Sequence, residues 1–304
     1  MMNLIYLVAP IFLVILLGKI LRWILIKDDL IWHDVNKLSY WVLFPALLFN
    51  KTSVIDFNKI EFGPFSLSLV GGFTISVFIA YIIGKILRLN AASHSSVIQG
   101  SGRHNSFLAL AVSTQVLGEQ GELIGALAVA VLVSFSNIVT VIMMTIMLSD
   151  TKFKKMGILA ELKRNPFIVA IVFGLLFNYL NLGYLPIVHD FTNNIGQAAL
   201  PLALLCVGAG LHFKGFNSQF LPCMLASVLK MGVFPASVYV ITTYFMLSPT
   251  MVLIAVIFAA APTSSAGYAL AKQMGGDAPL MATLISVQTL LAVLIIPIVI
   301  LLLG

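Results

Sequence analysis

Long apolar runs separated by short polar breaks are the feature of this sequence that most constrains its fold. A hydrocarbon layer about 30 Å thick is crossed by roughly 20 helical residues, each rising about 1.5 Å. Because lipid offers the backbone no hydrogen-bond partners, runs of this length favour transmembrane helices. The sequence therefore predicts an all-α polytopic membrane protein with ten transmembrane helices. The predicted spans are 3–22, 34–52, 63–87, 94–117, 122–148, 166–182, 192–211, 217–245, 250–273 and 279–303.

Composition excludes several other classes of protein. Apolar residues make up 60% of the 304 residues and charged residues 9%, whereas soluble domains average about 45–50% and about 25%. So few charges cannot cover a globule of this size in water, and lipid is the expected surrounding. The net charge is +6, but no Lys/Arg cluster is dense enough to follow phosphates, so no nucleic-acid partner is expected. The two cysteines and five histidines show no metal-ligand spacing, and we expect no metal and no other cofactor.

Basic residues predict the orientation of the chain, because cytoplasmic loops carry an excess of Lys and Arg. One side of the predicted topology holds Lys51 and Lys59. The other side, with the adjoining span ends, holds Lys19, Arg22, Lys27, Lys37, Lys85, Arg88, Lys152, Lys154, Lys155, Lys163, Arg164, Lys214 and Lys272. We therefore expect the second side to be cytoplasmic and both termini to lie outside.

The two halves of the chain match when the sequence is shifted by 156 residues. Residues 1–149 and 166–304 are thus predicted to be two five-helix repeats, joined by a cytoplasmic linker at 150–165. Because each repeat has an odd number of spans, the second enters the membrane inverted, as in transporters that alternate around one central site. Chance matching in an apolar sequence is the alternative. The aligned pairs are Pro10 with Pro166, Gly18 with Gly174, Pro45 with Pro201, Leu48 with Leu204, and Asn105 with Ala261.

Two spans contain polar runs that predict broken helices. Residues 99–106 and 259–267 lack the large aliphatic side chains of their surroundings, and Pro262 removes a backbone donor. A broken helix leaves backbone groups unpaired, which a membrane tolerates only where they line a cavity or bind a ligand. Half-helix N-termini favour an anion. A kink packed among small residues is the alternative for 259–267. The candidate binding residues are Arg103, His104, Asn105, Ser106, Pro262, Thr263, Ser264 and Ser265.

Two cations are predicted to lie within spans, whereas all acidic residues fall in connections or near span ends. Arg103 at mid-membrane costs about 3 kcal/mol on insertion scales, which favours a cavity, a partner or an anionic substrate. Lys230 is the second cation and joins the candidate binding residues. Bonding of its ammonium to backbone carbonyls is the alternative. His104 is a candidate proton carrier or a hydrogen-bonded packing residue.

Several ordered motifs resemble the auxin efflux carrier family, and the resemblance covers nearly the whole chain. It implies ten spans in inverted repeats, broken helices four and nine that cross, and transport of organic anions such as malate, malonate or auxin. Asn105 resembles the crossover asparagine and Pro262 the crossover proline, although His104 replaces the proline that precedes the asparagine in plant carriers. The short 150–165 connection resembles bacterial members. The motifs are Leu43–Phe49, Asn165–Ile168, Leu200–Leu204 with Val207–Ala209, Lys230 with Pro235, and Ala261–Ala266 with Ala271–Gly275.

These observations lead to one principal hypothesis and three alternatives. The first is a secondary active or facilitative carrier of a mono- or dicarboxylate in a bacterial cytoplasmic membrane. Related folds suggest spans 1, 2, 6 and 7 as scaffold and spans 3–5 and 8–10 as the moving bundle. The alternatives are an anion channel, a carrier of another small solute such as an amino acid, and an enzyme using Ser101 with Lys230. Nothing in the sequence brings that pair together, so we expect no enzyme. The anion, the direction, coupling to protons or sodium ions, and a monomer or homodimer stay open.

Overall fold

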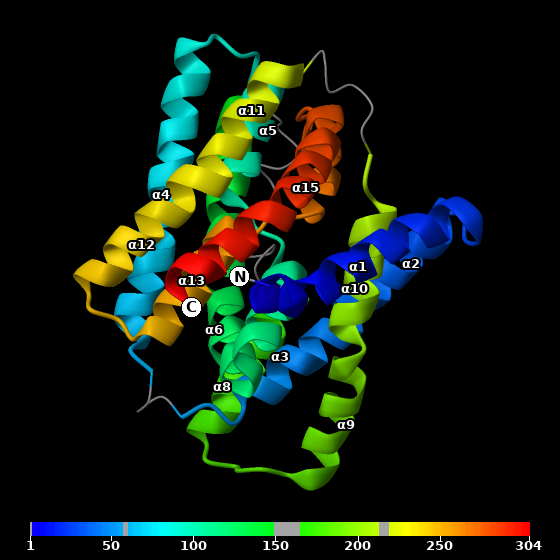
Figure 1. Ribbon diagram of the computed structural model, residues 1–304, viewed down its shortest axis with the longest axis vertical. Coiled ribbons are helices and arrows are strands. Elements are labelled where there is room, and N and C mark those ends of the chain that lie inside the picture. The colour runs from blue at the N-terminus through cyan, green and yellow to red at the C-terminus, as the bar shows by residue number, and fades with distance from the viewer. Residues whose placement is uncertain (1, 57–59, 149–164, 213–218) are drawn as a thin grey trace.

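The computed structural model describes residues 2–56, 60–148, 165–212 and 219–304, and every regular element in these ranges is a helix (Figure 1). The all-α prediction is therefore confirmed for the described residues. The predicted linker 150–165, apart from Asn165, lies outside them, as do Lys59 and Lys214. The elements are α1 (Met2–Ile24), α2 (Asp29–Leu38), η1 (Ser39–Leu43), α3 (Phe44–Thr52), α4 (Phe62–Ile86), α5 (Ala91–Gly102), α6 (Ser106–Leu148), α8 (Pro166–Tyr179), α9 (Pro186–Gln197), α10 (Ala199–Ala209), α11 (Phe220–Val228), η5 (Leu229–Val233), α12 (Phe234–Tyr244), α13 (Pro249–Ala260), α14 (Ala266–Met274) and α15 (Ala278–Leu303).

Five helical segments within the described ranges are long and apolar enough to cross a membrane. Two shorter helices, Pro166–Tyr179 and Pro249–Ala260, are also apolar. A chain with this many apolar helices can bury them only in lipid, because a soluble core would leave their outer faces in water. The five segments are Tyr6–Ile24, Phe62–Ile86, Ala91–Leu148, Phe220–Tyr244 and Ala278–Leu303.

Two helical regions begin earlier than the sequence predicted. The predicted span 34–52 starts at Asp29 and runs through the π-helical turn η1 into α3, with the Asp28 carboxylate accepting from the N–H of Leu30 at 2.9 Å. The predicted span 192–211 starts at Pro186 and consists of α9 and α10. Both added parts are amphipathic and carry Asp and His residues, so a search for apolar runs does not detect them.

The helix α6 reverses direction at Gly118, which has φ 59° and ψ −138°. This conformation is open to glycine and is rarely adopted by residues with a Cβ. The two halves then pack closely against each other beside the turn. A Cβ on Gly121 would lie only 1.9 Å from the Ser113 carbonyl oxygen, so this approach requires glycine. The turn lies between the predicted spans 94–117 and 122–148, where the sequence predicted a connection.

The helices α1 and α10 cross in direct backbone contact (Figure 1). A Cβ on Gly18 would meet the Leu205 carbonyl oxygen at 2.0 Å, and one on Gly208 would meet the Ile15 carbonyl oxygen at 1.7 Å. Small residues permit this close approach in membrane helices, where it replaces the hydrophobic driving force. The contact therefore depends on glycine at both positions.

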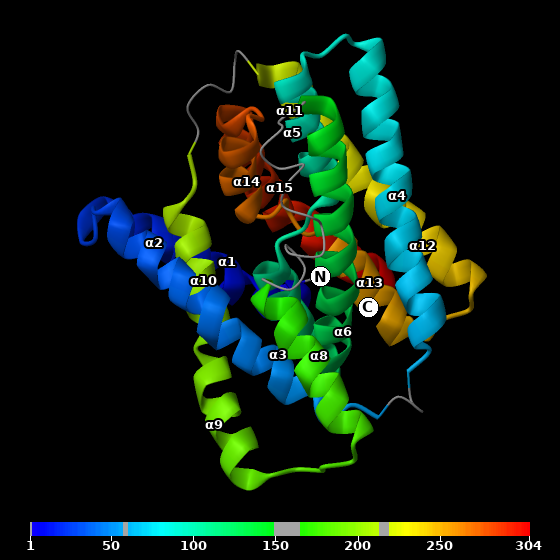
Figure 2. The ribbon, with the colours of Figure 1, turned by 180° about the vertical axis from the view of Figure 1, so that it is seen from behind.

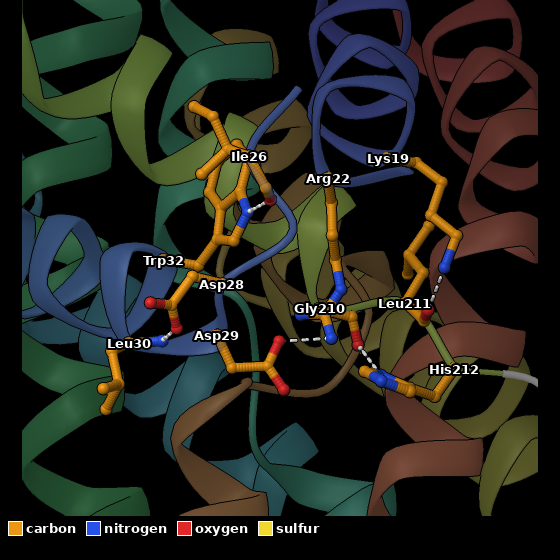
Figure 3. Close-up of polar contacts among 10 residues, drawn as sticks. All are labelled: Lys19, Arg22, Ile26, Asp28, Asp29, Leu30, Trp32, Gly210, Leu211 and His212. Atoms are coloured by element: carbon orange, nitrogen blue, oxygen red, sulfur yellow. Dashed lines mark hydrogen bonds and ion pairs between the residues drawn. The ribbon is translucent and has the colours of Figure 1, made fainter. Parts of the chain in front are cut away.

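Polar contacts close the end of this helix pair (Figure 3). Lys19 donates from Nζ to the Leu211 carbonyl oxygen at 2.6 Å, next to the C-terminus of α10. Arg22 forms an ion pair with Asp29, and the indole of Trp32 donates to the Ile26 carbonyl at 2.8 Å. A cation beside the unpaired carbonyls of a helix end is favourable, so Lys19 ties α1 to α10.

A second group of helices lies on the opposite side of the molecule from α1 and α10 (Figure 1). In both views α4 and α12 lie at one edge and α9 and α10 at the other (Figure 2). The helix α4 packs along α12, and α13 packs against α6, α12 and α15. The two broken helices lie between these edges, and the site is built on them.

Candidate functional site

Two helices break at the places that the sequence predicted. The first break separates α5, which ends at Gly102, from α6, which begins at Ser106. The second separates α13, which ends at Ala260, from α14, which begins at Ala266. The backbone at each break is extended, with φ −61° and ψ 154° at Arg103 and φ −61° and ψ 142° at Ala261.

The two breaks contact each other through hydrogen bonds. The N–H of Asn105 donates to the Pro262 carbonyl oxygen at 2.7 Å. The hydroxyl of Thr263 donates to the Gln99 carbonyl oxygen at 3.4 Å. Backbone groups freed by one break are therefore partly satisfied by the other, which is the condition for non-helical backbone inside a membrane protein.

Asn105 also caps the helix that follows it. Its side-chain Oδ1 accepts from the N–H of Leu108 at 3.1 Å, and its carbonyl accepts from the N–H of Ala109 at 3.0 Å. This is the N-cap arrangement that Asn favours. The Nδ2 group is buried and has no hydrogen-bond partner among the described residues. One end of this side chain therefore holds the helix, and the other is free to donate to a ligand.

A small cavity of about 40 Å³ lies at the first break. Since a water needs about 10–15 Å³ measured in this way, the cavity holds only a few waters. Four of the predicted site residues line it, namely Arg103, His104, Ser106 and Ser264. The other lining residues are Tyr40, Val133, Ser136, Asn137, Asn165, Phe167 and Ala266.

The cavity wall carries donors without acceptors. Arg103 is 8% exposed, and its Nε and Nη1 have no hydrogen-bond partner among the described residues. His104 contacts the Ser106 hydroxyl through Nε2 at 3.0 Å, while its Nδ1 is unpartnered in the same set. No Asp or Glu is buried in the described part of the chain. The Arg103 N–H groups are therefore available to an acceptor in the cavity.

Lys230 lies outside the lining of this cavity. It is fully buried, donates from Nζ to the Ala259 carbonyl oxygen at 2.8 Å and lies 4.3 Å from the centre of the Phe234 ring. Its charge is therefore held at the C-terminal end of α13, where a cation is favourable. This is the carbonyl-bonded alternative that the sequence left open.

Other predicted groups have separate roles. Pro262 and Thr263 belong to the link between the breaks, and Ser265 does not line the cavity. Ser101 donates to the Val97 carbonyl oxygen at 2.8 Å, whereas Lys230 is bonded to Ala259. The nucleophile and base of the enzyme alternative are thus engaged with different carbonyls.

Sequence reasoning missed several polar residues around the breaks. The cavity-lining residues Tyr40, Ser136 and Asn137 lie within mainly apolar helices. Asn165 caps α8 by accepting from the N–H groups of Phe167 and Ile168. Gln288 of α15 contacts both breaks. The available signal was a polar residue inside an apolar span, because burying a polar side chain without a partner is costly.

A second and larger cavity, of about 410 Å³, lies between α1, α3, α9 and α10 on one side and α6 on the other. Its wall is mostly apolar, with Thr114, Gln115, Glu122 and Gln197 as polar members. Glu122 forms an ion pair with Lys51 of α3 at 3.0 Å. The volume falls in the range of about 300–1,000 Å³ usual for small-molecule sites.

Comparison with known proteins assigns the chain to a family. A family model described as "Membrane transport protein" matches residues 4–300. No curated protein matches the chain. The family consists of transporters and not of enzymes, which agrees with the expectation from the sequence. Together with the apolar helices of this chain, the family match makes the protein a multi-pass membrane protein. The chain therefore belongs to the membrane transport protein family, which is the family of the auxin efflux carriers.

Proposed function

We propose that this transporter carries a small organic anion, a mono- or dicarboxylate, by alternating access around the two broken helices. The proposal rests on the buried N–H donors of Arg103 and Asn105, which have no acceptor among the described residues. A carboxylate accepts several charge-assisted hydrogen bonds and neutralises the buried guanidinium. Ser106 and Ser264 would add hydroxyl donors from the cavity wall, next to His104. Pro262, Thr263 and Ser265 would complete the site as the backbone segment of the second break.

Helix lengths support the proposal of ten spans in two inverted five-helix repeats, 1–149 and 166–304. The helices α5 and α13 each contain 12 residues, and each is capped by the side chain of the preceding residue, Asn90 or Ser248. The segments Phe62–Ile86 and Phe220–Tyr244 each contain 25 residues. Equal elements in equal order are what two copies of one unit would produce.

The two cavities support alternating access. The larger one separates α1, α3, α9 and α10, which belong to the proposed scaffold spans 1, 2, 6 and 7, from α6 of the proposed moving spans 3–5 and 8–10. The smaller one admits only a few waters at the break. A large cavity between scaffold and moving bundle, together with a small cavity at the break, is expected for one state of an alternating-access carrier.

The same proposal includes location and energy coupling. We place the protein in a bacterial cytoplasmic membrane, surrounded by lipid, with both termini outside, as the basic residues indicate. His104 is the titratable group at the cavity whose reference pKa is nearest neutrality. Protons, sodium ions or no coupling ion remain alternatives, as does a homodimer. Saturable exchange would distinguish the carrier from a channel.

A ligand screen tests the proposed substrate class. Purified protein should unfold at a higher temperature with one or more mono- or dicarboxylates, because a ligand stabilises by RT ln(1+[L]/Kd), about 2.7 kcal/mol at 100 Kd. Liposomes containing the protein should exchange the same anion. Stabilisation and flux with amino acids or cations, and not with carboxylates, would reject the proposal.

Asn105→Ser separates helix capping from ligand binding. Serine is a good N-cap, so the unfolding temperature without ligand should change little. The variant lacks the Nδ2 donor, and carboxylate binding should weaken by about 1–3 kcal/mol. Calorimetric binding to purified protein measures this effect, with Asn105→Leu, which removes both functions, as the comparison. Unchanged affinity in Asn105→Ser would place the site elsewhere.

Lys230→Met tests whether the second buried cation contributes a positive field. Methionine has a similar length, and removing a desolvated charge offsets the loss of the bond to Ala259, so folded protein should persist. Anion uptake into liposomes should fall strongly, and Lys230→Arg should retain more of it. Wild-type uptake by folded Lys230→Met would leave Lys230 with a purely structural role.

A further inference from the structure

The breaks leave specific backbone groups without their helical partners. In an unbroken helix the N–H of Thr263 would donate to the Ala259 carbonyl, four residues earlier. Because α13 ends at Ala260, Thr263 lies beyond the helix and its N–H needs another acceptor. The Ala259 carbonyl accepts from Lys230. In the other broken helix, the carbonyl of Gly100 lies within the last turn of α5 and needs another donor.

A single side chain satisfies both of these groups. Gln288 of α15 accepts from the N–H of Thr263 through Oε1 at 2.8 Å and donates from Nε2 to the Gly100 carbonyl oxygen at 3.0 Å. Gln288 is fully buried. The amide orientation follows from its partners, because a carbonyl requires a donor and an N–H requires an acceptor. Only an uncharged amide or a protonated carboxylic acid offers one donor and one acceptor in this arrangement.

We propose that Gln288 is a positioning residue that holds the two breaks in register for transport. Gln288 does not line the cavity at the break, so it acts through the backbone that carries Arg103 and Ser264. The bond to Gly100 fixes the end of α5 just before Arg103, and the bond to Thr263 fixes the residue before Ser264. The inference rests on the proposed anion transport, whose donors these two segments supply.

The variant Gln288→Glu tests this role through the pH dependence of uptake. An ionised glutamate accepts a hydrogen bond from Thr263 but cannot donate to Gly100, whereas a protonated glutamate does both. Uptake by this variant, divided by wild-type uptake at the same pH, should rise as the pH falls through the titration of the introduced carboxyl. We expect a change of about tenfold or more, because an unpaired buried carbonyl and an unneutralised buried charge are both costly.

Gln288→Leu is the matched control, since it fills similar space and neither donates nor accepts. Its uptake relative to the wild type should be low and independent of pH. The wild type corrects for titration of the substrate and of other groups on or next to the elements packed against α15. Those groups are Tyr6, Lys19, Arg22, His94, Arg103, His104, His212, Cys223, Lys230, Tyr268, Lys272 and Asp277.

Thermal unfolding without substrate supplies a readout that does not depend on transport. Purified Gln288→Glu should become more stable relative to the wild type as the pH falls. A flat relative profile in both uptake and unfolding, with active wild type, would overturn the positioning role. Failure of the wild type to transport any carboxylate would instead reject the proposed function, and the unfolding profile would still test the contact with the two breaks.

Discussion

Replacement of Arg103 by methionine is expected to abolish anion uptake and to leave the protein at least as stable as the wild type. The guanidinium is buried, and its Nε and Nη1 have no partner among the described residues. Without substrate, two of its three nitrogens therefore contribute desolvation cost that no hydrogen bond offsets. With a carboxylate bound, it would donate charge-assisted hydrogen bonds worth about 1.5–3 kcal/mol each, so affinity should fall by about 100-fold.

Arg103→Lys is the matched variant for this experiment. Lysine keeps the charge but lacks the planar fork, so binding should be weaker than in the wild type and stronger than in Arg103→Met. Calorimetry and thermal unfolding of the same purified samples measure affinity and stability together. Wild-type affinity in Arg103→Met would contradict the anion site, and a large loss of stability would instead indicate that the guanidinium has a structural partner.

Gly208→Val should prevent recovery of folded protein. A Cβ at this position would lie 1.7 Å from the Ile15 carbonyl oxygen, which is a backbone atom and cannot turn aside as a side chain can. Accommodation requires α1 and α10 to separate along their crossing. The loss should exceed the roughly 1–3 kcal/mol of ordinary overpacking and approach the total stability of many proteins, about 5–15 kcal/mol.

Gly63→Val introduces the same side chain where no atom lies within 4 Å of the added Cβ. This control should give a yield and an unfolding temperature close to those of the wild type. Size-exclusion chromatography after detergent extraction measures both variants. A monodisperse Gly208→Val at wild-type yield would show that the crossing of α1 and α10 adjusts more easily than the backbone contact implies.

The sequence predicted the helical class and the position of both breaks because the physical signals are local. Mid-span polar runs and Pro262 mark where a helix cannot continue in lipid. The early starts at Asp29 and Pro186 were missed because amphipathic turns have a low mean hydropathy. Their apolar faces are recognised only once a neighbouring helix is present to cover them.

The site was predicted in part for a similar reason. Arg103, His104, Ser106 and Ser264 line the cavity, and they all belong to the polar runs. Gln288 and Tyr40 come from other helices, and only the packing of those helices brings them to the breaks. Lys230 was identified as buried, but whether its ammonium meets a carbonyl or a ligand depends on the position of Ala259 in another helix.

The 12-residue length of α5 and α13 has an electrical consequence. Such a helix extends about 18 Å, a little more than half of a hydrocarbon layer about 30 Å thick. In the proposed orientation, α5 begins at the inner face and α13 at the outer face, so an anion at the breaks has crossed about half of the membrane voltage from either side. A full crossing at 100 mV corresponds to about 2.3 kcal/mol per charge, of which roughly 1.2 kcal/mol would act on each half. Voltage would then change both the apparent affinity on one side and the rate of release on the other.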